Sequence, residues 1–428
     1  MESRIKKLTE VYGNTRKIPL TYQTRNKVDE RFVNDLTRDK HIVLHGGSKQ
    51  GKSCLRKYHI SDDECIVIQC TRDYSLESLY EQILKNAGIQ YEVSSQITTK
   101  GTHKITATVS GEGGIPLVSK AKGEGKYEYD KESSDSSSYK SLDIDPTEPN
   151  DIVRVLNLND FSKYIIIEDF HYLNEEIQRQ FSFDLKVFHE TSDIVFLIVG
   201  VWQESNRLTV FNGDLSGRVT NINADEWSDN DLTNLIRSGF PLLNIRFPDE
   251  VIENIIEASN ENVGLVQELC YRICENNSTW QTQEDLKVIG SIDEVKSAVQ
   301  SITNDLATRY KTFMRKFSEG LSVTEFEMYR WIMFGVIVSS TDELRNGIAP
   351  NILFNKLKYR HPKKERLQLT HLNQALERVH NVQTKHKLQP FILDFSNEEL
   401  FVVDANFLIF LESKSQDELM EIIDINVA

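Results

Sequence analysis

The stretch from Gly46 to Ser53 reads Gly-Gly-Ser-Lys-Gln-Gly-Lys-Ser, a spacing of glycine, lysine and serine that could hold a phosphate group. Glycines let successive backbone N–H groups point inward as an anion nest, and the dipole of a following helix also favours negative charge. Lys52 would reach the β and γ phosphates, and the Ser53 hydroxyl would ligate Mg²⁺. The candidate nucleotide-binding residues of this stretch are Gly46, Gly47, Ser48, Lys49, Gln50, Gly51, Lys52, Ser53 and Cys54.

Two carboxylates follow the hydrophobic run Ile165 to Ile167 and supply a second chemical feature. Hydrolysis of a bound triphosphate needs acidic residues at the end of a neighbouring strand to hold Mg²⁺ and orient water. We expect Glu168 to contact the metal through water and Asp169 to polarise the attacking water. Glu comes first in this pair, whereas Asp usually occupies the first position. The alternative interpretation is that the two acids merely cap a strand.

Further polar residues follow later hydrophobic runs. Gln203 and Asn206 come after the run that ends at Gly200, and either could sense the γ-phosphate; ordinary loop residues are an equal alternative. Arg218 precedes another strand and could stabilise transition-state charge from within the site or from a neighbouring subunit. A surface salt bridge is the alternative for Arg218. Arg272 is a weaker candidate for closing on the phosphate.

Buried parallel strands must position these residues. His41 to Leu44 predict a strand, the residues after the phosphate-binding loop predict a helix, and Cys65 to Cys70 predict the next strand. The runs 164–169, 194–200 and 219–223 continue the pattern, since continuous apolar runs are typical of strands that helices cover on both faces. The sequence therefore predicts an α/β fold with a parallel sheet.

Residues 91–150 change in character and interrupt the predicted sheet. Glycines are frequent, and Ile105, Ala107 and Val109 alternate with polar residues, as do Tyr127 and Tyr129. We expect an inserted β-hairpin or two with a flexible tip at Ser133 to Ser138. A disordered linker is the alternative.

Helices dominate the pattern after Ala224. Ser228 and Asp231 form a predicted capping box, two amphipathic helices follow, and a long helix is expected over 292–317. Three helices (324–334, 351–359 and 370–386) and a strand-turn-strand over 391–404 then read as a winged helix. The predicted domains are an N-terminal segment on the nucleotide site (1–34), a P-loop core (35–225), a helical lid and connector (226–318) and a winged-helix domain (319–428).

Composition narrows the class of protein. A chain of 428 residues suggests about two to four domains, and 39% hydrophobic with 27% charged residues is typical of soluble globular proteins. The sequence has no apolar run long enough for a membrane span and no signal-peptide pattern, which predicts a cytoplasmic protein. Five cysteines without a C-x-x-C pair predict reduced thiols and no zinc site.

Charge is distributed unevenly along the chain. The net charge is −15, which argues against nucleic-acid binding over the whole surface. The stretch from Asn355 to Pro390 nevertheless holds nine Lys or Arg against two Glu, a local charge of +7. This pattern predicts one basic patch on an acidic body, where nucleic acid could bind.

The order of these parts resembles the AAA+/STAND ATPases, and within them the prokaryotic branch allied to origin-recognition initiators. The resemblance rests on HGGSKQGKS, IIIEDF, the run ending at Gly200, an arginine before the last strand, a helical lid and a winged helix. It covers about residues 22–413 apart from the insertion, and Asn262-Val263-Gly264 stands where the family has Gly-x-Pro. It implies ATP with Mg²⁺, and it implies that the segment with Tyr22 and Arg25 packs on adenine and ribose.

Three functions remain open at this point. The resemblance implies a switch whose nucleotide state controls homo-oligomerisation or a partner protein, and bacterial anti-phage defence is a typical setting for such a protein. An initiator-like ATPase would place residues 370–386 in the major groove of DNA, with Lys363, Lys364 and Arg366 on phosphates. A module that binds nucleotide without hydrolysing it is the third hypothesis.

Overall fold

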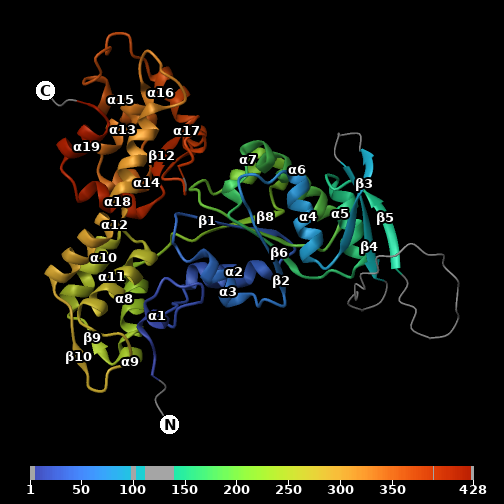
Figure 1. The fold of residues 1–428 in the computed structure, drawn as a ribbon, viewed down its shortest axis with the longest axis horizontal. Helices are drawn as coiled ribbons and strands as arrows, with labels where there is room; N and C mark the ends of the chain where they lie inside the picture. The colour runs from blue at the N-terminus through green and yellow to red at the C-terminus, as the bar shows by residue number, and fades with distance from the viewer. Residues whose placement is uncertain (1–4, 98–102, 111–138, 389, 426–428) are drawn as a thin grey trace, which may run out of the picture.

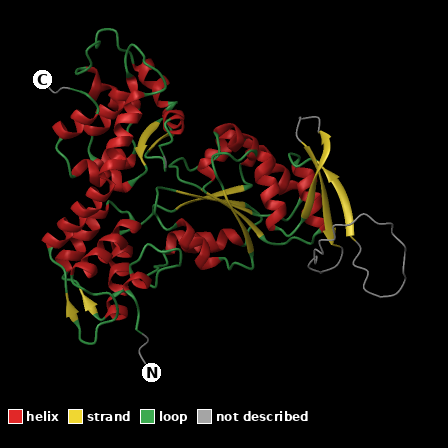
Figure 2. Cartoon of the chain, in the orientation of Figure 1, coloured by secondary structure: helices red, strands yellow, loops and turns green. Residues whose placement is uncertain are grey.

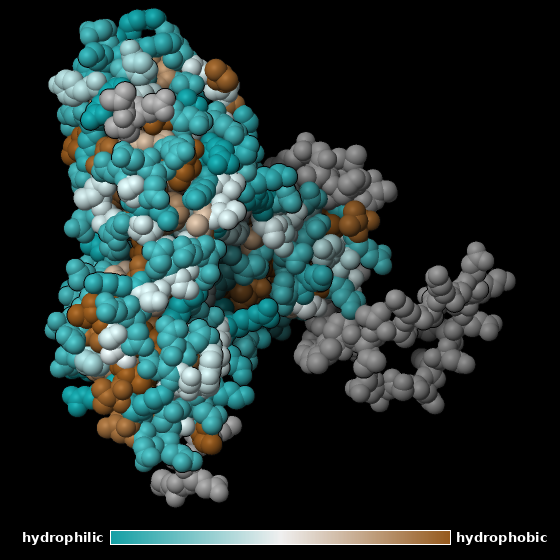
Figure 3. All heavy atoms as spheres, turned by 60° about the vertical axis from the view of Figure 1, so that its left-hand side comes forward, coloured by the Kyte–Doolittle hydropathy of each residue, from teal (hydrophilic) through white to brown (hydrophobic). Residues whose placement is uncertain are grey.

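The structure, a computed structural model, describes residues 5–97, 103–110, 139–388 and 390–425. Figure 1 shows a central sheet, a small second sheet at one end, and two groups of helices at the other end. No helix among the described residues is long and apolar enough to cross a membrane. The face drawn in Figure 3 is covered mostly by hydrophilic residues.

The central sheet has five parallel strands in the order β2-β6-β7-β1-β8. The strands are β1 (His41–His45), β2 (Cys65–Gln69), β6 (Tyr164–Glu168), β7 (Phe196–Val199) and β8 (Val219–Asn223). Residues of β6 alternate between two cores: Ile166 packs in one, and Ile165 and Ile167 pack in the other. This alternation explains the continuous apolar runs, because both faces of the sheet are buried.

Helices cover both faces of the central sheet (Figures 1 and 2). One face packs against α2 (Asn26–Leu36) and α3 (Lys52–His59), through side chains that include Phe32 and Leu55. The other face packs against α4 (Leu76–Asn86), α5 (Pro149–Leu158), α6 (Glu175–Thr191) and α7 (Arg207–Phe211), with the 3-10 turns η1 (Phe170–Tyr172) and η2 (Gly213–Leu215) nearby. The α/β layering is therefore the predicted one.

The predicted insertion contains a separate antiparallel sheet in the order β3-β4-β5. Its strands are β3 (Gln90–Ile97), β4 (His103–Ser110) and β5 (Tyr139–Ile144). Ile105 and Ala107 are buried, and β4 and β5 contact α5. The hairpin interpretation is thus confirmed for these strands, whereas Tyr127, Tyr129 and the serine run 133–138 lie outside the described residues.

A group of elements between the sheet and the C-terminal helices is called the lid here. It comprises α8 (Asp229–Ser238), α9 (Phe240–Leu243), β9 (Ile245–Arg246), α10 (Asp249–Ser259), α11 (Val263–Asn276), β10 (Lys287–Val288) and α12 (Ile292–Glu319). The predicted capping box at Ser228 and Asp231 is present. The short helix α1 (Leu8–Val11) joins the lid core, and the Tyr12 hydroxyl donates to the Ile236 carbonyl.

The remaining residues form a group of helices with one β-hairpin, called the C-terminal helices here. They are α13 (Met328–Ile337), α14 (Thr341–Asn346), α15 (Pro350–Lys358), α16 (Leu369–Leu376), α17 (Val379–Lys385), the antiparallel pair β11 (Leu393–Ser396) and β12 (Glu399–Val402), α18 (Ala405–Glu412) and α19 (Gln416–Ile422). Their shared core includes Trp331, Leu353 and Phe407.

Two predicted boundaries in this region are wrong. The helix expected over 324–334 begins at Met328, and the single helix expected over 370–386 is divided into α16 and α17 at Glu377 and Arg378. The division has a tertiary cause, because α16 packs on α13 and α15 whereas α17 packs on β11. The Gln383 side chain ties α17 to that strand, since it accepts from Ile392 N–H and donates to the Leu393 carbonyl.

Candidate functional site

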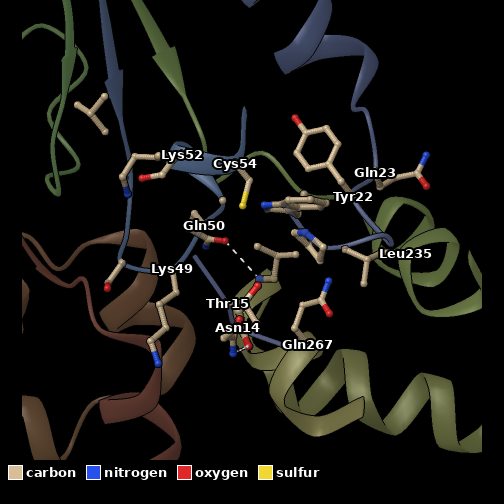
Figure 4. A pocket seen from close by; sticks show the side chains of 18 of the residues that line it. Asn14, Thr15, Tyr22, Gln23, Lys49, Gln50, Lys52, Cys54, Leu235 and Gln267 are labelled. Atoms are coloured by element: carbon tan, nitrogen blue, oxygen red, sulfur yellow. Dashed lines mark hydrogen bonds between the residues drawn. The ribbon is translucent and has the colours of Figure 1, made fainter. Parts of the chain in front are cut away.

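A pocket of about 340 Å³ lies where the carboxyl edge of the central sheet meets the N-terminal segment and the lid. Its walls come from four parts of the chain, namely residues 13–25, 48–54, the ends of β6 and β7, and residues 227–267. Figure 4 shows the predicted phosphate-binding loop on one side and Tyr22 with Leu235 on another. Segments far apart in sequence therefore build one cavity.

The loop between β1 and α3 has the backbone that a phosphate nest requires. The φ angles of Gly46, Lys49 and Gly51 are 127°, 61° and 81°. A Cβ at Gly46 would lie 2.5 Å from Asp225 Oδ1, so this position has no room for another residue. Residues 48–54 line the pocket, whereas Gly46 and Gly47 lie beside Asp225 and are absent from its lining.

Lys52 is buried at the start of α3 and is held on the loop itself. Its Nζ donates to the carbonyl of Gly46 at 3.0 Å and of Gly47 at 2.5 Å. Burial lowers the pKa of Lys52, and the carboxylates of Asp225, Glu168 and Asp169 oppose this effect. A buried ammonium beside the pocket suits an anionic ligand.

The two predicted acids lie at the end of β6 and both line the pocket. Glu168 accepts from the Ser53 hydroxyl at 3.3 Å and from the Arg56 guanidinium at 3.3 Å. Asp169 has a left-handed backbone with φ of 55° and accepts from the Gln69 amide. Burial, with the nearby charge of Glu168, raises the pKa of Asp169. The structure therefore brings Ser53, Glu168 and Asp169 together, and it adds Arg56, which the sequence patterns did not indicate.

Aromatic and cationic side chains form the opposite end of the pocket. The Arg25 guanidinium lies 4.1 Å from the centroid of the Trp227 ring and donates to the Ala224 carbonyl. Tyr22 donates to Asp29 at 2.7 Å and stacks on Tyr58. Tyr22, Arg25 and Cys54 all line the cavity, as does Trp227. Sequence reasoning missed Trp227, although its place just after a predicted strand was an available signal.

The lid contacts the phosphate-binding loop directly at the start of α11. The Asn262 side chain donates to the Ser48 carbonyl at 2.9 Å, and Gly264 N–H donates to the Lys49 carbonyl at 3.1 Å. A Cβ at Gly264 would lie 2.7 Å from Lys49 Cβ and 3.0 Å from its carbonyl oxygen. We call this set of interactions the lid contact.

The C-terminal helices contact the same loop from another side. Ser48 N–H donates to the Val403 carbonyl at 3.1 Å, and Gln203 N–H donates to Asp394 at 3.1 Å. Asp394 is buried and also pairs with His380 at 2.7 Å and with the Ser396 hydroxyl at 2.8 Å. We call this set the C-terminal contact. It was not foreseen from the sequence, because Val403 acts through its backbone.

The other predicted residues lie outside the pocket lining. Gln203 donates its side-chain amide to Asp225, and Asn206 is exposed at the start of α7. Arg218 lies at the amino ends of the strands, whereas the pocket lies at their carboxyl ends. Its carbonyl accepts from His41 N–H at the start of β1, and its guanidinium pairs with Glu190. Arg272 is bonded to Glu268, Ser301 and Asp305. The geometry thus gives Arg218 no role within the site of its own chain, and it directs Arg272 away from the loop.

No protein-family model matches the sequence, and no curated protein matches it. Among solved structures, the chain is similar to a Walker-type ATPase of Pyrococcus abyssi, with 10% identity and a TM-score of 0.52 over 94% of this chain and 99% of that one. This likeness confirms the predicted α/β fold with a P-loop NTPase parallel sheet.

Two other structures are similar at lower TM-scores. One is the Orc1 protein of Aeropyrum pernix in complex with DNA, with 10% identity and a TM-score of 0.44 over 98% of each chain. The other is the RuvB Holliday junction branch migration motor of Thermotoga maritima, with 13% identity and a TM-score of 0.39 over 89% of this chain and 92% of that one. At these scores neither likeness adds to the argument.

Proposed function

We propose that this protein is an ATP-binding and ATP-hydrolysing switch of the AAA+/STAND type, in which the nucleotide controls the docking of the C-terminal helices. The observation that carries the proposal is the hydrogen bond from Ser48 N–H to the Val403 carbonyl, at 3.1 Å. The Ser48 N–H of the phosphate-binding loop is thus bonded to the C-terminal helices, which are the part of the chain that would dock and release. Nucleotide can shift such an equilibrium by its different affinity for the docked and released states.

The residues of the pocket fit ATP from end to end. The N–H groups at the start of α3 and the buried Lys52 suit the phosphates, while Trp227, Tyr22 and Arg25 suit a base and ribose. The volume of about 340 Å³ lies within the range of small-molecule sites. Bound ATP would supply the phosphoanhydride bond whose cleavage the switch uses.

The acidic pair supports hydrolysis as part of the proposal. Ser53 and Glu168 would hold Mg²⁺, and their separation of 3.3 Å places both oxygens on one side of the pocket. Arg56 holds Glu168 in place from behind through an ion pair between two buried groups. Asp169 would orient the attacking water, and its raised pKa makes it a better proton acceptor than an ordinary carboxylate.

Arg218 enters the proposal as a group offered to a neighbouring chain. It lies across the sheet from the loop of its own chain and remains partly exposed. A second copy would therefore have to bring its own pocket to this edge. The switch would control binding either to further copies of this chain or to a partner protein, and both predictions are kept.

The first test is nucleotide binding and solution mass, measured with and without ATP and Mg²⁺. Lys52→Ala should weaken ATP binding at least about a hundredfold, because it removes the buried cation of the loop. Lys85→Ala is the control, since Lys85 is exposed on α4 and lies outside the pocket lining. Wild type should change mass or shape on adding ATP, and Lys52→Ala should not. Equal ATP affinities for wild type and Lys52→Ala would overturn the proposal.

DNA binding is the second candidate function, and the basic segment favours it. Arg360, Lys363, Lys364 and Arg366 are exposed, although Lys363 and Arg366 both lie near Glu325. The double variant Lys363→Glu with Lys364→Glu should lower affinity for duplex DNA and flatten its dependence on salt. A binding curve identical to that of wild type would exclude this segment as the DNA contact.

Turnover separates the switch from a module that binds nucleotide without hydrolysing it. Asp169→Asn should abolish ATP hydrolysis and leave ATP affinity within about threefold, because Asp169 acts on water in the proposal. Wild-type protein that binds ATP and releases no phosphate would favour the non-hydrolysing module.

A further inference from the structure

Asp225 occupies a position that no sequence pattern assigned. It lies two residues after β8, and because β8 pairs with β1, it arrives beside the first residues of the phosphate-binding loop. Both carboxylate oxygens accept from Gly47 N–H, at 2.8 and 2.9 Å. Asp225 N–H in turn donates to Asn223 Oδ1 at 2.9 Å, which fixes the turn that carries it.

The carboxylate of Asp225 also acts on Lys52, the cation of the loop. Among the acids that influence the pKa of Lys52, Asp225 has the largest effect, ahead of Glu168 and Asp169. Lys52 Nζ lies on the carbonyls of Gly46 and Gly47, the residues that border Asp225. An internal anion therefore shares the part of the loop where the lysine would meet the β and γ phosphates.

Gln203 connects this anion to the C-terminal helices. Its side-chain amide donates to Asp225 Oδ2 at 2.8 Å, and its backbone N–H donates to Asp394 Oδ2 at 3.1 Å. Two consecutive donors of the loop are thus taken by oxygens of the protein, Gly47 by Asp225 and Ser48 by Val403. Any movement of Asp225 therefore disturbs Gln203, which also belongs to the C-terminal contact.

We infer that Asp225 determines the phosphate specificity of the site, because its carboxylate holds Gly47, the residue whose carbonyl accepts from Lys52, the cation that a γ-phosphate would use. The inference rests on the proposed function. The pocket then binds a nucleoside diphosphate more tightly than the triphosphate, since like charges at short range repel in a partly buried site. The triphosphate binds fully only after Asp225 has left Gly47, which also releases Gln203.

The test compares the affinities of ADP and of the non-hydrolysable β,γ-imido analogue of ATP, measured by calorimetry in the presence of Mg²⁺. Wild type should bind ADP at least about tenfold more tightly than the analogue. Asp225→Asn keeps the shape of the side chain and removes its charge, so it should tighten the analogue about tenfold and leave ADP within about twofold. Asp229→Asn is the control, because Asp229 is exposed four residues further on, and its affinities should equal those of wild type.

Each outcome has a distinct meaning. An unchanged ratio of the two affinities in a folded Asp225→Asn variant would overturn the inference and leave the proposed function intact. Equal affinities for ADP and the analogue in wild type would overturn it without any variant, so the test survives if Asp225→Asn fails to fold. If wild type binds neither nucleotide, the proposed function fails and the inference fails with it.

Discussion

The phosphate-binding loop is touched from two sides, and the two contacts differ in kind. The lid contact is close-packed: Gly264 N–H bonds the Lys49 carbonyl, and a Cβ at Gly264 would lie only 2.7 Å from Lys49 Cβ. The C-terminal contact is polar, with the buried Asp394 pairing with His380 and receiving the Gln203 N–H. Packing of the first kind resists separation, whereas a few polar bonds can be exchanged for bonds to water or ligand.

This difference suggests a division of roles between the two contacts. The lid core includes Trp227 and Val263, which also line the pocket, so a bound nucleotide would pack directly against this core. The C-terminal helices share their core with the end of α12, through Tyr310, Phe313 and Phe317. They reach the loop only through the Val403 carbonyl, while the Asp394 carboxylate accepts from Gln203 N–H beside it. In the proposed switch, the lid holds the nucleotide and the C-terminal helices respond to it.

The largest expected effect comes from breaking the packed contact. Gly264→Val would force α11 away from Lys49 and should weaken nucleotide binding about a hundredfold, as expected for overpacking of about 3 kcal/mol. Gly213→Val is the matched control, because a Cβ at Gly213 meets no atom of the described residues within 4 Å. Nucleotide affinities measured by calorimetry decide the matter. If Gly264→Val binds nucleotide as tightly as wild type, the lid contact can adjust to added volume and is no more rigid than the C-terminal contact.

A smaller effect is expected from breaking the polar contact. Asp394→Asn removes the charge of the acceptor that Gln203 N–H uses, and it should weaken docking by about 2 kcal/mol, without a comparable loss of nucleotide affinity. Hydrogen exchange of the Ser48 amide reports docking, because this N–H donates to Val403. The control is Asp417→Asn, an exposed acid in the first turn of α19. Unchanged Ser48 protection would show that Asp394 does not hold the C-terminal helices in place.

The smallest expected effect is a loss of stability at lower pH, which should affect the C-terminal contact and not the lid contact. His171 is buried where its ring meets Phe391 of the C-terminal helices, and burial lowers its pKa to about 3, with Lys52, Arg207 and His380 acting in the same direction and Asp394 opposing. A pKa below that of the unfolded chain means that the neutral form is stabilised, so stability is present above pH 6.5 and declines as the pH falls toward 3.

Between pH 7 and 6 the loss should be below about 1 kcal/mol, since each such group contributes about 1.4 kcal/mol per pH unit only well below its unfolded pKa. We expect the Ser48 amide to lose protection over this step, after correction for the intrinsic exchange rate. The Gly264 amide should hold its protection, because Asn262, Val263 and Gly264 do not titrate. His171→Asn should reduce the pH response at Ser48, and the remainder belongs to His45 directly before the loop, because burial lowers its pKa to about 4. Equal loss at both amides would contradict the distinction.

The sequence predicted the parts of the site that are local in the chain. Gly46 to Ser53 and Glu168 with Asp169 could be found because each chemical group directly follows its own hydrophobic strand. The same reasoning could have found Asp225, which follows the predicted strand 219–223 as an acid. It was missed because one carboxylate after a strand has no distinctive spacing.

Other features depend on tertiary packing and have no local pattern. Val403 contacts Ser48 through its backbone carbonyl, which every residue carries, and 355 positions separate the two in the sequence. The division of the predicted helix 370–386 follows from the attachment of Gln383 to β11 rather than from the periodicity of the helix itself. Arg218 has the expected place before β8, but the sheet turns that end away from the loop.

The order in which the pocket walls occur along the chain has a consequence for synthesis on the ribosome. The pocket is lined by residues 13–25 and also by residues of 263–267. It is therefore incomplete until the start of α11 has left the ribosome. Val403 is made much later, and during that interval Ser48 N–H has not yet met its partner. A nascent chain of that length would meet cellular nucleotide before its own C-terminal helices, so ligand could occupy the loop before the protein has finished folding.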